Sequence, residues 1–119
     1  MNKVGQEIVT KAQFNTFKKT CLTLKERFGL SGWDFYFEWK EIDVQASVSW
    51  IYCGKIATFT LCKKSFGKIC ARTCAIHELL HVILAPLQFR AELRHTNSQE
   101  IENAAEDIVM LLEKLVIHR

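Results

Sequence analysis

The sequence feature that most constrains this chain is the stretch AIHELLH at residues 75–81, in which His77 and His81 flank Glu78. It lies within a run from about Ser65 to Leu84 that predicts a helix. Residues four apart on a helix share one face, so the two histidines can offer imidazole nitrogens to one metal ion. Glu78 lies roughly 100° around the helix from His77, near enough to hold and deprotonate a metal-bound water. The spacing therefore supplies two metal ligands and a general base.

The residues around the motif predict that it lies inside the fold. They make the helix apolar nearly all round, so the two histidines and Glu78 would be carried into the interior. Burying two imidazoles and a carboxylate without partners is costly, and a metal ion would remove that cost for all three side chains. The alternative is a core helix with two hydrogen-bonded histidines and a glutamate paired to a lysine or an arginine.

Length, charge and hydropathy narrow the class of protein. At 119 residues the chain is expected to form one domain, residues 1–119. The net charge of +3 is small and the basic residues are scattered, so nucleic-acid binding is not expected. No apolar run has the length of a membrane span, and the N-terminus lacks the apolar core of a signal peptide. We therefore expect a cytoplasmic monomer that does not bind a membrane.

The five cysteines are an odd number without a C-x-x-C pair, and they do not predict a disulfide framework. Cys70 and Cys74 share the helical face of His77 and His81. Four ligands along one straight helix would span roughly 16 Å, however, which is too far for one tetrahedral ion. At most one thiol could join the histidines, and we interpret both as small buried apolar residues.

Hydrophobic periodicity predicts an α+β fold. A capping-box pattern at Thr10 and Gln13 begins an amphipathic helix from about Thr10 to Phe28. Pro86 should end the motif helix, residues 87–97 are expected to be irregular, and a last helix should run from Ser98 to about Ile117. Between the first helix and the motif helix the pattern alternates with a period of two, and short connections indicate three antiparallel neighbouring strands. These strands are expected at residues 33–40, 44–50 and 56–62.

A zinc site built on two histidines needs a third protein ligand and leaves the fourth position for water. No glycine stands three residues beyond His81, and no histidine stands six residues beyond it. The remaining source is a carboxylate of the last helix, where Glu102 and Glu106 occur in the stretch ENAAE. On a helical wheel Glu102 lies roughly 100° from the centre of the apolar stripe and Glu106 roughly 40° further out, so Glu102 can point inward more easily. Glu106 and His95 remain alternatives.

The motif HELLH followed by E-x-x-A-E resembles the gluzincin type of zinc metallopeptidase, in which E-x-x-A-D is frequent. The resemblance implies that Glu102 binds zinc and that Glu106 orients a ligand histidine. This chain has glutamate in place of aspartate at the last position, which leaves open a swap of the two roles. The order of helix, antiparallel strands, motif helix and ligand helix is similar to a minimal zincin domain. Small predicted metallopeptidases of bacteriophages and prophages look similar in length and order.

The resemblance also implies an activity, which is hydrolysis of a protein or peptide substrate by a zinc-activated water with Glu78 as general base. A further donor must stabilise the oxyanion, and His95, Tyr52, Arg94 or Arg90 could supply it. The sequence does not choose among them, and we name His95 as the catalytic candidate.

An edge strand of the sheet could hold an extended substrate by strand addition, and by chain order the strand at residues 56–62 is the candidate. The competing functional class is a catalytically silent zincin-fold module that binds a host or partner protein. An intact Glu78 argues against this class, because a protein that only binds does not need the base.

Overall fold

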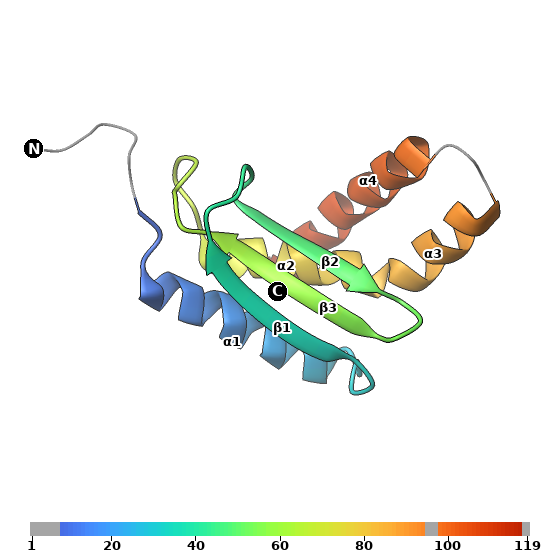
Figure 1. Cartoon of the computed structure of the whole chain (residues 1–119), viewed down its shortest axis with the longest axis horizontal. Coiled ribbons are helices and arrows are strands. Elements are labelled where there is room, and N and C mark those ends of the chain that lie inside the picture. The colour runs from blue at the N-terminus through green and yellow to red at the C-terminus, as the bar shows by residue number, and fades with distance from the viewer. Residues whose placement is uncertain (1–7, 95–97, 118–119) are drawn as a thin grey trace, which may run out of the picture.

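A three-stranded sheet forms one layer of the fold, and helices lie against one of its faces (Figure 1). The computed structural model describes residues 8–94 and 98–117. Helices α1 and α2 pack against each other and against the sheet, whereas α3 and the start of α4 extend to one side of it. The expected α+β class is confirmed. In chain order the elements are α1 (Lys11–Arg27), β1 (Asp34–Lys40), β2 (Ala46–Ile51), β3 (Ile56–Cys62), α2 (Ala71–Ile83), α3 (Ala85–Arg94) and α4 (Ser98–Ile117).

The sheet is mixed, so the expectation of three antiparallel strands is wrong. The strand order is β1-β3-β2, with β1 parallel to β3 and β2 antiparallel to it. The short connection at residues 41–45 predicts a hairpin, but it crosses the end of β3 instead, and β3 lies between the two strands that it joins. Only β2 and β3 form a hairpin, and Lys55 in its turn has a φ of 53°. Strand β3 is therefore central, and β1 and β2 are the edges.

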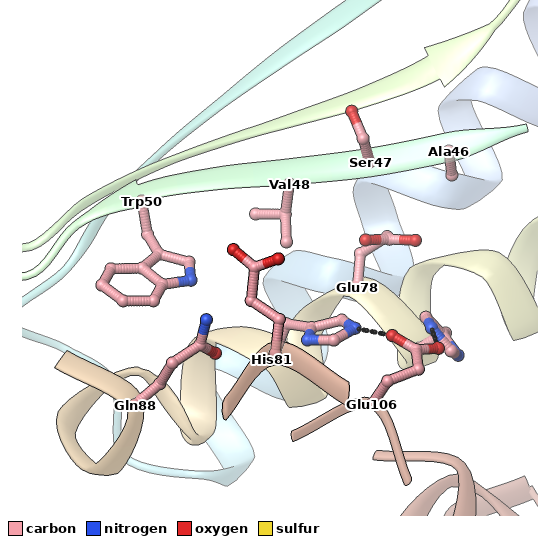
Figure 2. A pocket seen from close by; sticks show the side chains of 10 residues that line it. Ala46, Ser47, Val48, Trp50, Glu78, His81, Gln88 and Glu106 are labelled. Atoms are coloured by element: carbon pink, nitrogen blue, oxygen red, sulfur yellow. Dashed lines mark ion pairs between the residues drawn. The ribbon is translucent and has the colours of Figure 1, made fainter. Parts of the chain in front are cut away.

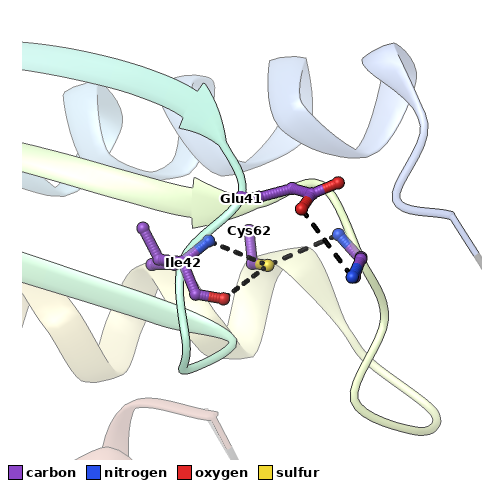
Figure 3. Close-up of polar contacts among 4 residues, drawn as sticks. Glu41, Ile42 and Cys62 are labelled. Carbon is purple, nitrogen blue, oxygen red and sulfur yellow. Dashed lines mark hydrogen bonds and ion pairs between the residues drawn. The ribbon is translucent and has the colours of Figure 1, made fainter.

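The thiol of Cys62 fastens the crossing loop to the end of β3 (Figure 3). Its Sγ lies 3.5 Å from the amide nitrogen of Ile42, 3.3 Å from the carbonyl oxygen of Ile42 and 3.4 Å from the amide nitrogen of Lys64. The fully buried thiol of Cys62 thus links the backbone of Ile42 and of Lys64 to the end of β3 through partly buried contacts. An exposed ion pair between Glu41 and Lys64, at 3.7 Å, adds a second link between the two segments.

Aromatic side chains of α1 and the sheet form one end of the core. The predicted capping box begins α1, because the Gln13 amide donates to Thr10 Oγ1 at 3.2 Å and the Thr10 amide donates to Gln13 Oε1 at 2.8 Å. Phe17 of α1 is fully buried and meets Phe37 of β1 and Phe59 of β3 edge to face. The period-two pattern of the strands therefore turns their aromatic residues toward α1.

The motif helix is shorter than expected, since α2 begins at Ala71 rather than at Ser65. Gly67 has a φ of 115°, which interrupts a helical backbone. The side chain of Gln45 also accepts a hydrogen bond from the amide of Phe66 at 2.7 Å, and so holds this loop against the crossing loop. The run before Ala71 is therefore a connection, although its composition is compatible with a helix.

All five cysteines lie within the described residues, and none of them forms a disulfide, as expected. Cys74 is half-buried on α2. Cys70 lies just before α2 and is exposed, so the expectation that both thiols are buried is wrong for Cys70. The late start of the helix places Cys70 in the loop.

The segment after Pro86 is helical as far as Arg94, which corrects the expectation of irregular chain at residues 87–97. Helix α3 begins at Ala85, directly after α2. Pro86 therefore lies in the first turn of α3, where its missing N–H removes no helical hydrogen bond. Helix α4 occupies residues 98–117, as expected. Among the helices described, none combines the length and the apolar character needed to cross a membrane.

Candidate metal centre

Helix α2 presents the three motif residues under strand β2, and Figure 2 shows Glu78 and His81 on this side of the helix. His77 and His81 are half-buried, and their ring centroids lie 5.2 Å apart. Glu78 is only 9% exposed. The helical spacing thus places both imidazoles together, as the sequence predicts. The helix is fixed in the core by buried apolar side chains on its other positions, namely Ala75, Ile76, Leu79, Leu80 and Val82.

The carboxylate of Glu106 on α4 joins the two histidines. Its Oε2 lies 2.8 Å from Nε2 of His77, and its Oε1 lies 2.8 Å from Nε2 of His81. Figure 2 shows this carboxylate pointing toward the motif helix. One ligand atom from each of the three residues lies within 4.8 Å of the other two. Two segments that are 25 or more residues apart in sequence therefore meet at a single point.

A second carboxylate of α4, Glu113, contacts the other nitrogen of His77. Its Oε1 lies 2.6 Å from Nδ1 of His77, and the Glu113 side chain is 17% exposed. A metal-ligating histidine commonly donates its second ring N–H to a carboxylate, which fixes the tautomer and the orientation of the ring. Glu113 is not among the site residues predicted from the sequence. Its seven-residue spacing from Glu106 places both residues on one face of α4, and this spacing was the signal that could have identified it.

The donor set fits a metal ion. Two imidazole nitrogens and a carboxylate oxygen are the ligand types of three-ligand sites that keep one position open. The three side chains come from two helices that are packed against each other, so their positions do not depend on a mobile loop. His77, His81 and Glu106 could therefore hold a metal ion.

The other predicted site residues lie outside this group or outside the described part of the chain. Glu102 is exposed and lines the same cavity as the histidines, but it is not part of the group of three. His95 lies outside the described residues. Tyr52 does not line the cavity, and the guanidinium of Arg90 stacks over the Tyr52 ring, 5.6 Å from its centroid. Arg94 is exposed at the end of α3 and does not line the cavity either.

A cavity of about 420 Å³ opens between α2, α4 and strand β2. Ser47, Val48 and Trp50 of β2 line one side, and Gln88 of α3 lines an end. The strand at residues 56–62 was expected to be the edge strand, and this expectation is wrong because β3 is central. The edge strand beside the motif helix is β2.

Burial and nearby charges shift the pKa values of His77 and His81 in opposite directions. Burial lowers the pKa of His77, but the hydrogen bond that His77 donates to Glu113 and the charges of Glu78 and Glu106 outweigh it, so the net pKa is raised above its usual value of 6.5. Burial also lowers the pKa of His81, and there the nearby Glu106 does not compensate, so the net pKa is lowered. In the absence of metal, His77 is therefore the histidine of this pair that takes up a proton more readily.

Burial is also the main cause of the raised pKa of Glu78. It raises the pKa of Glu78 from 4.5 to about 7, and the charges of Glu106 and Glu113 add to this shift while His77 opposes it. A carboxyl group whose pKa lies near the working pH can both accept and return a proton. Perturbed titrating groups in a cavity are typical of catalytic sites, although structural ion pairs produce them too.

Comparisons with known proteins do not identify the chain. No family model, no curated protein and no solved structure matches it. The resemblance to gluzincins therefore stays a prediction based on the two short motifs.

Proposed function

We propose that the protein is a zinc metallopeptidase in which His77, His81 and Glu106 hold the ion and Glu78 is the general base. The observation that carries the proposal is the meeting of these four side chains in one cavity, with Glu78 buried beside the group of three. A site of two histidines and one glutamate with an open position is a ligand set of hydrolytic zinc enzymes. Glu106 takes the ligand role here, which is the alternative that the sequence left open.

Each side chain has a separate task in this proposal. Glu78 accepts the proton of the attacking water and passes it to the nitrogen of the leaving amine. Glu113 accepts a hydrogen bond from Nδ1 of His77, which would leave Nε2 to bind the ion. A bound zinc ion supplies Lewis acidity, which lowers the pKa of water toward about 7 and polarises the carbonyl of the substrate.

Strand β2 is the proposed binding surface for an extended peptide. It pairs only with β3 in the part of the chain that the structure describes, so its outer edge has backbone groups free to pair with another strand. A peptide added to this edge would pass over the motif helix, because residues of β2 and of α2 line the same cavity. Backbone hydrogen bonds would hold the peptide, and Val48 and Trp50 would contact its side chains.

The test is cleavage of a mixed peptide library by zinc-loaded protein, with Glu78→Gln as the matched variant. Glu78→Gln keeps the side-chain shape and the three ligands but cannot accept a proton, so cleavage should fall by about 10²–10⁴-fold while zinc remains bound. The melting temperature and the zinc content of both proteins are measured in parallel. Retained cleavage by the variant with zinc bound would refute the role of Glu78. A zinc-loaded wild type that cleaves no peptide would instead favour a binding module.

A further inference from the structure

Helix α4 carries an apolar stripe that the fold leaves largely exposed. The stripe runs with alternating spacings of three and four residues, which is the heptad pattern of a helix that packs on another helix. Ile108, Leu111 and Leu115 in this stripe are 38%, 64% and 67% exposed. The complete stripe consists of Ile101, Ala104, Ile108, Leu111 and Leu115.

This stripe borders the core face of α4 and lies opposite the face that carries the metal centre. Ala105 and Val109 are the buried residues of α4, and they face the rest of the fold. The centre of the stripe lies roughly 170° around the helix from Glu106 and Glu113, at 100° per residue. A partner on the stripe would therefore leave the candidate metal centre open.

We propose that the stripe pairs with the same stripe of a second copy of this chain, with the two α4 helices antiparallel. In an antiparallel pair, the two kinds of heptad core position face each other. One register then places Ile108 opposite Leu111 of the second copy and Ala104 opposite Leu115 of the second copy. Both of these layers are apolar, and two-fold symmetry makes each of them occur twice, which gives four layers. The pairing differs from the monomer expected from the sequence.

The charges beside the stripe fit this register. Asp107 and Lys114 occupy equivalent heptad positions seven residues apart on the same flank, and both are exposed. Antiparallel pairing at this register brings Asp107 of one copy next to Lys114 of the other, so two opposite-charge pairs flank the centre of the interface. The residues at the flanks of a coiled coil set the choice and orientation of the partner. A parallel pairing would not bring these two positions together.

The shape of the groove next to α4 fits the same register. A largely apolar cavity of about 220 Å³ lies between α3 and α4, with Leu87, Ala104 and Ile108 among its lining residues. Leu87 at the rim is 62% exposed. The register places Leu115 of the second copy opposite the small side chain of Ala104, which is where the cavity lies. A large side chain would thus enter a hole beside a small one, as in helix packing of the knobs-into-holes type.

The test is the oligomeric state of the full chain, measured by sedimentation equilibrium over a range of concentrations. Two heptads form a small interface, so we expect a dimer with a dissociation constant of roughly 1–100 µM. Leu111→Glu should raise this constant by about tenfold or more. The matched control is Met110→Glu, because Met110 is 50% exposed on the same helix but lies outside the stripe, and this variant should dimerise like wild type.

Charge variants test the register and do not depend on the fold tolerating a glutamate in the stripe. Asp107→Lys and Lys114→Asp should each weaken self-association, and the double variant should restore it. A mixture of the two single variants should form heterodimers in preference to either homodimer. A chain that stays monomeric up to about 500 µM would overturn the proposal. A dimer that is unaffected by Leu111→Glu, or a double variant that is weaker than both single variants, would also overturn it.

Discussion

Replacing Glu78 by glutamine should stabilise the metal-free protein, and the gain should appear only above the pH at which the carboxyl ionises in the unfolded chain. Burial raises the pKa of Glu78 from 4.5 in the unfolded chain to about 7 in the folded protein. The folded state therefore holds the proton more tightly than the unfolded state does. Below about pH 4.5 both states are protonated and burial of the carboxyl carries no charge penalty. Between about pH 4.5 and 7 the unfolded chain releases the proton while the folded protein keeps it, so stability falls over this range and levels off above pH 7.

The size of this effect follows from the shift. One pKa unit corresponds to 1.36 kcal/mol, so a rise from 4.5 to about 7 amounts to roughly 3 kcal/mol of lost stability at pH 8 and above. Glutamine resembles the neutral acid in shape and charge. Glu78→Gln should therefore be more stable than wild type by about 3 kcal/mol at pH 8, and by less than about 1 kcal/mol at pH 5.

The assay is urea unfolding of both proteins at pH 5 and pH 8 in the presence of a chelator. Glu102→Gln is the matched control, because Glu102 is an exposed carboxylate of the same cavity, and its change should stay within about 0.5 kcal/mol at both pH values. A stability difference for Glu78→Gln that is equal at the two pH values would refute the reasoning. It would mean that Glu78 is not a buried group that titrates near neutrality.

Two other perturbations test single contacts. Glu113→Gln removes the charge that holds Nδ1 of His77 and should weaken zinc affinity by about 10–100-fold, as measured by competition with a chromophoric chelator; an affinity equal to wild type would exclude a positioning role. Cys62→Ala removes a fully buried thiol that contacts the backbone of Ile42 and Lys64, and it should lower the free energy of unfolding by about 1–3 kcal/mol in a urea titration. A change below about 0.5 kcal/mol would mean that the loop is held by other contacts.

Local patterns in the sequence predicted the elements well where the signal was strong. The capping box at Thr10 and the aromatic alternation from residue 33 onward identified α1 and β1, and the limits of β3 agree with the expected residues 56–62. The order of the strands was not predictable in the same way. A five-residue connection fits a hairpin on length alone, and the contacts of Cys62 that hold it across β3 depend on side chains far apart in sequence.

In the candidate site, too, the features set within one helix were predictable, and those set by packing between helices were not. The spacing of His77 and His81 is set within one helix, so the sequence placed both on one face. The choice between Glu102 and Glu106 depends on where α4 passes α2 along its length, which a helical wheel does not describe. Glu106 meets both imidazoles, whereas Glu102 lies at the cavity one turn earlier on α4. Glu113 was missed for the same reason, because its contact with His77 depends on the packing of two helices.

The zinc content of the purified protein is the most direct test of the proposed centre. Elemental analysis of wild type, Glu106→Gln and Glu102→Gln, after zinc loading and removal of excess metal, compares two carboxylates of the same helix and cavity. We predict about one zinc per chain for wild type, with three protein ligands. Glu102→Gln should retain this content, and Glu106→Gln should lose most of it. A wild-type content near zero, or loss of zinc in Glu102→Gln but not in Glu106→Gln, would contradict the assignment of His77, His81 and Glu106 as the ligands.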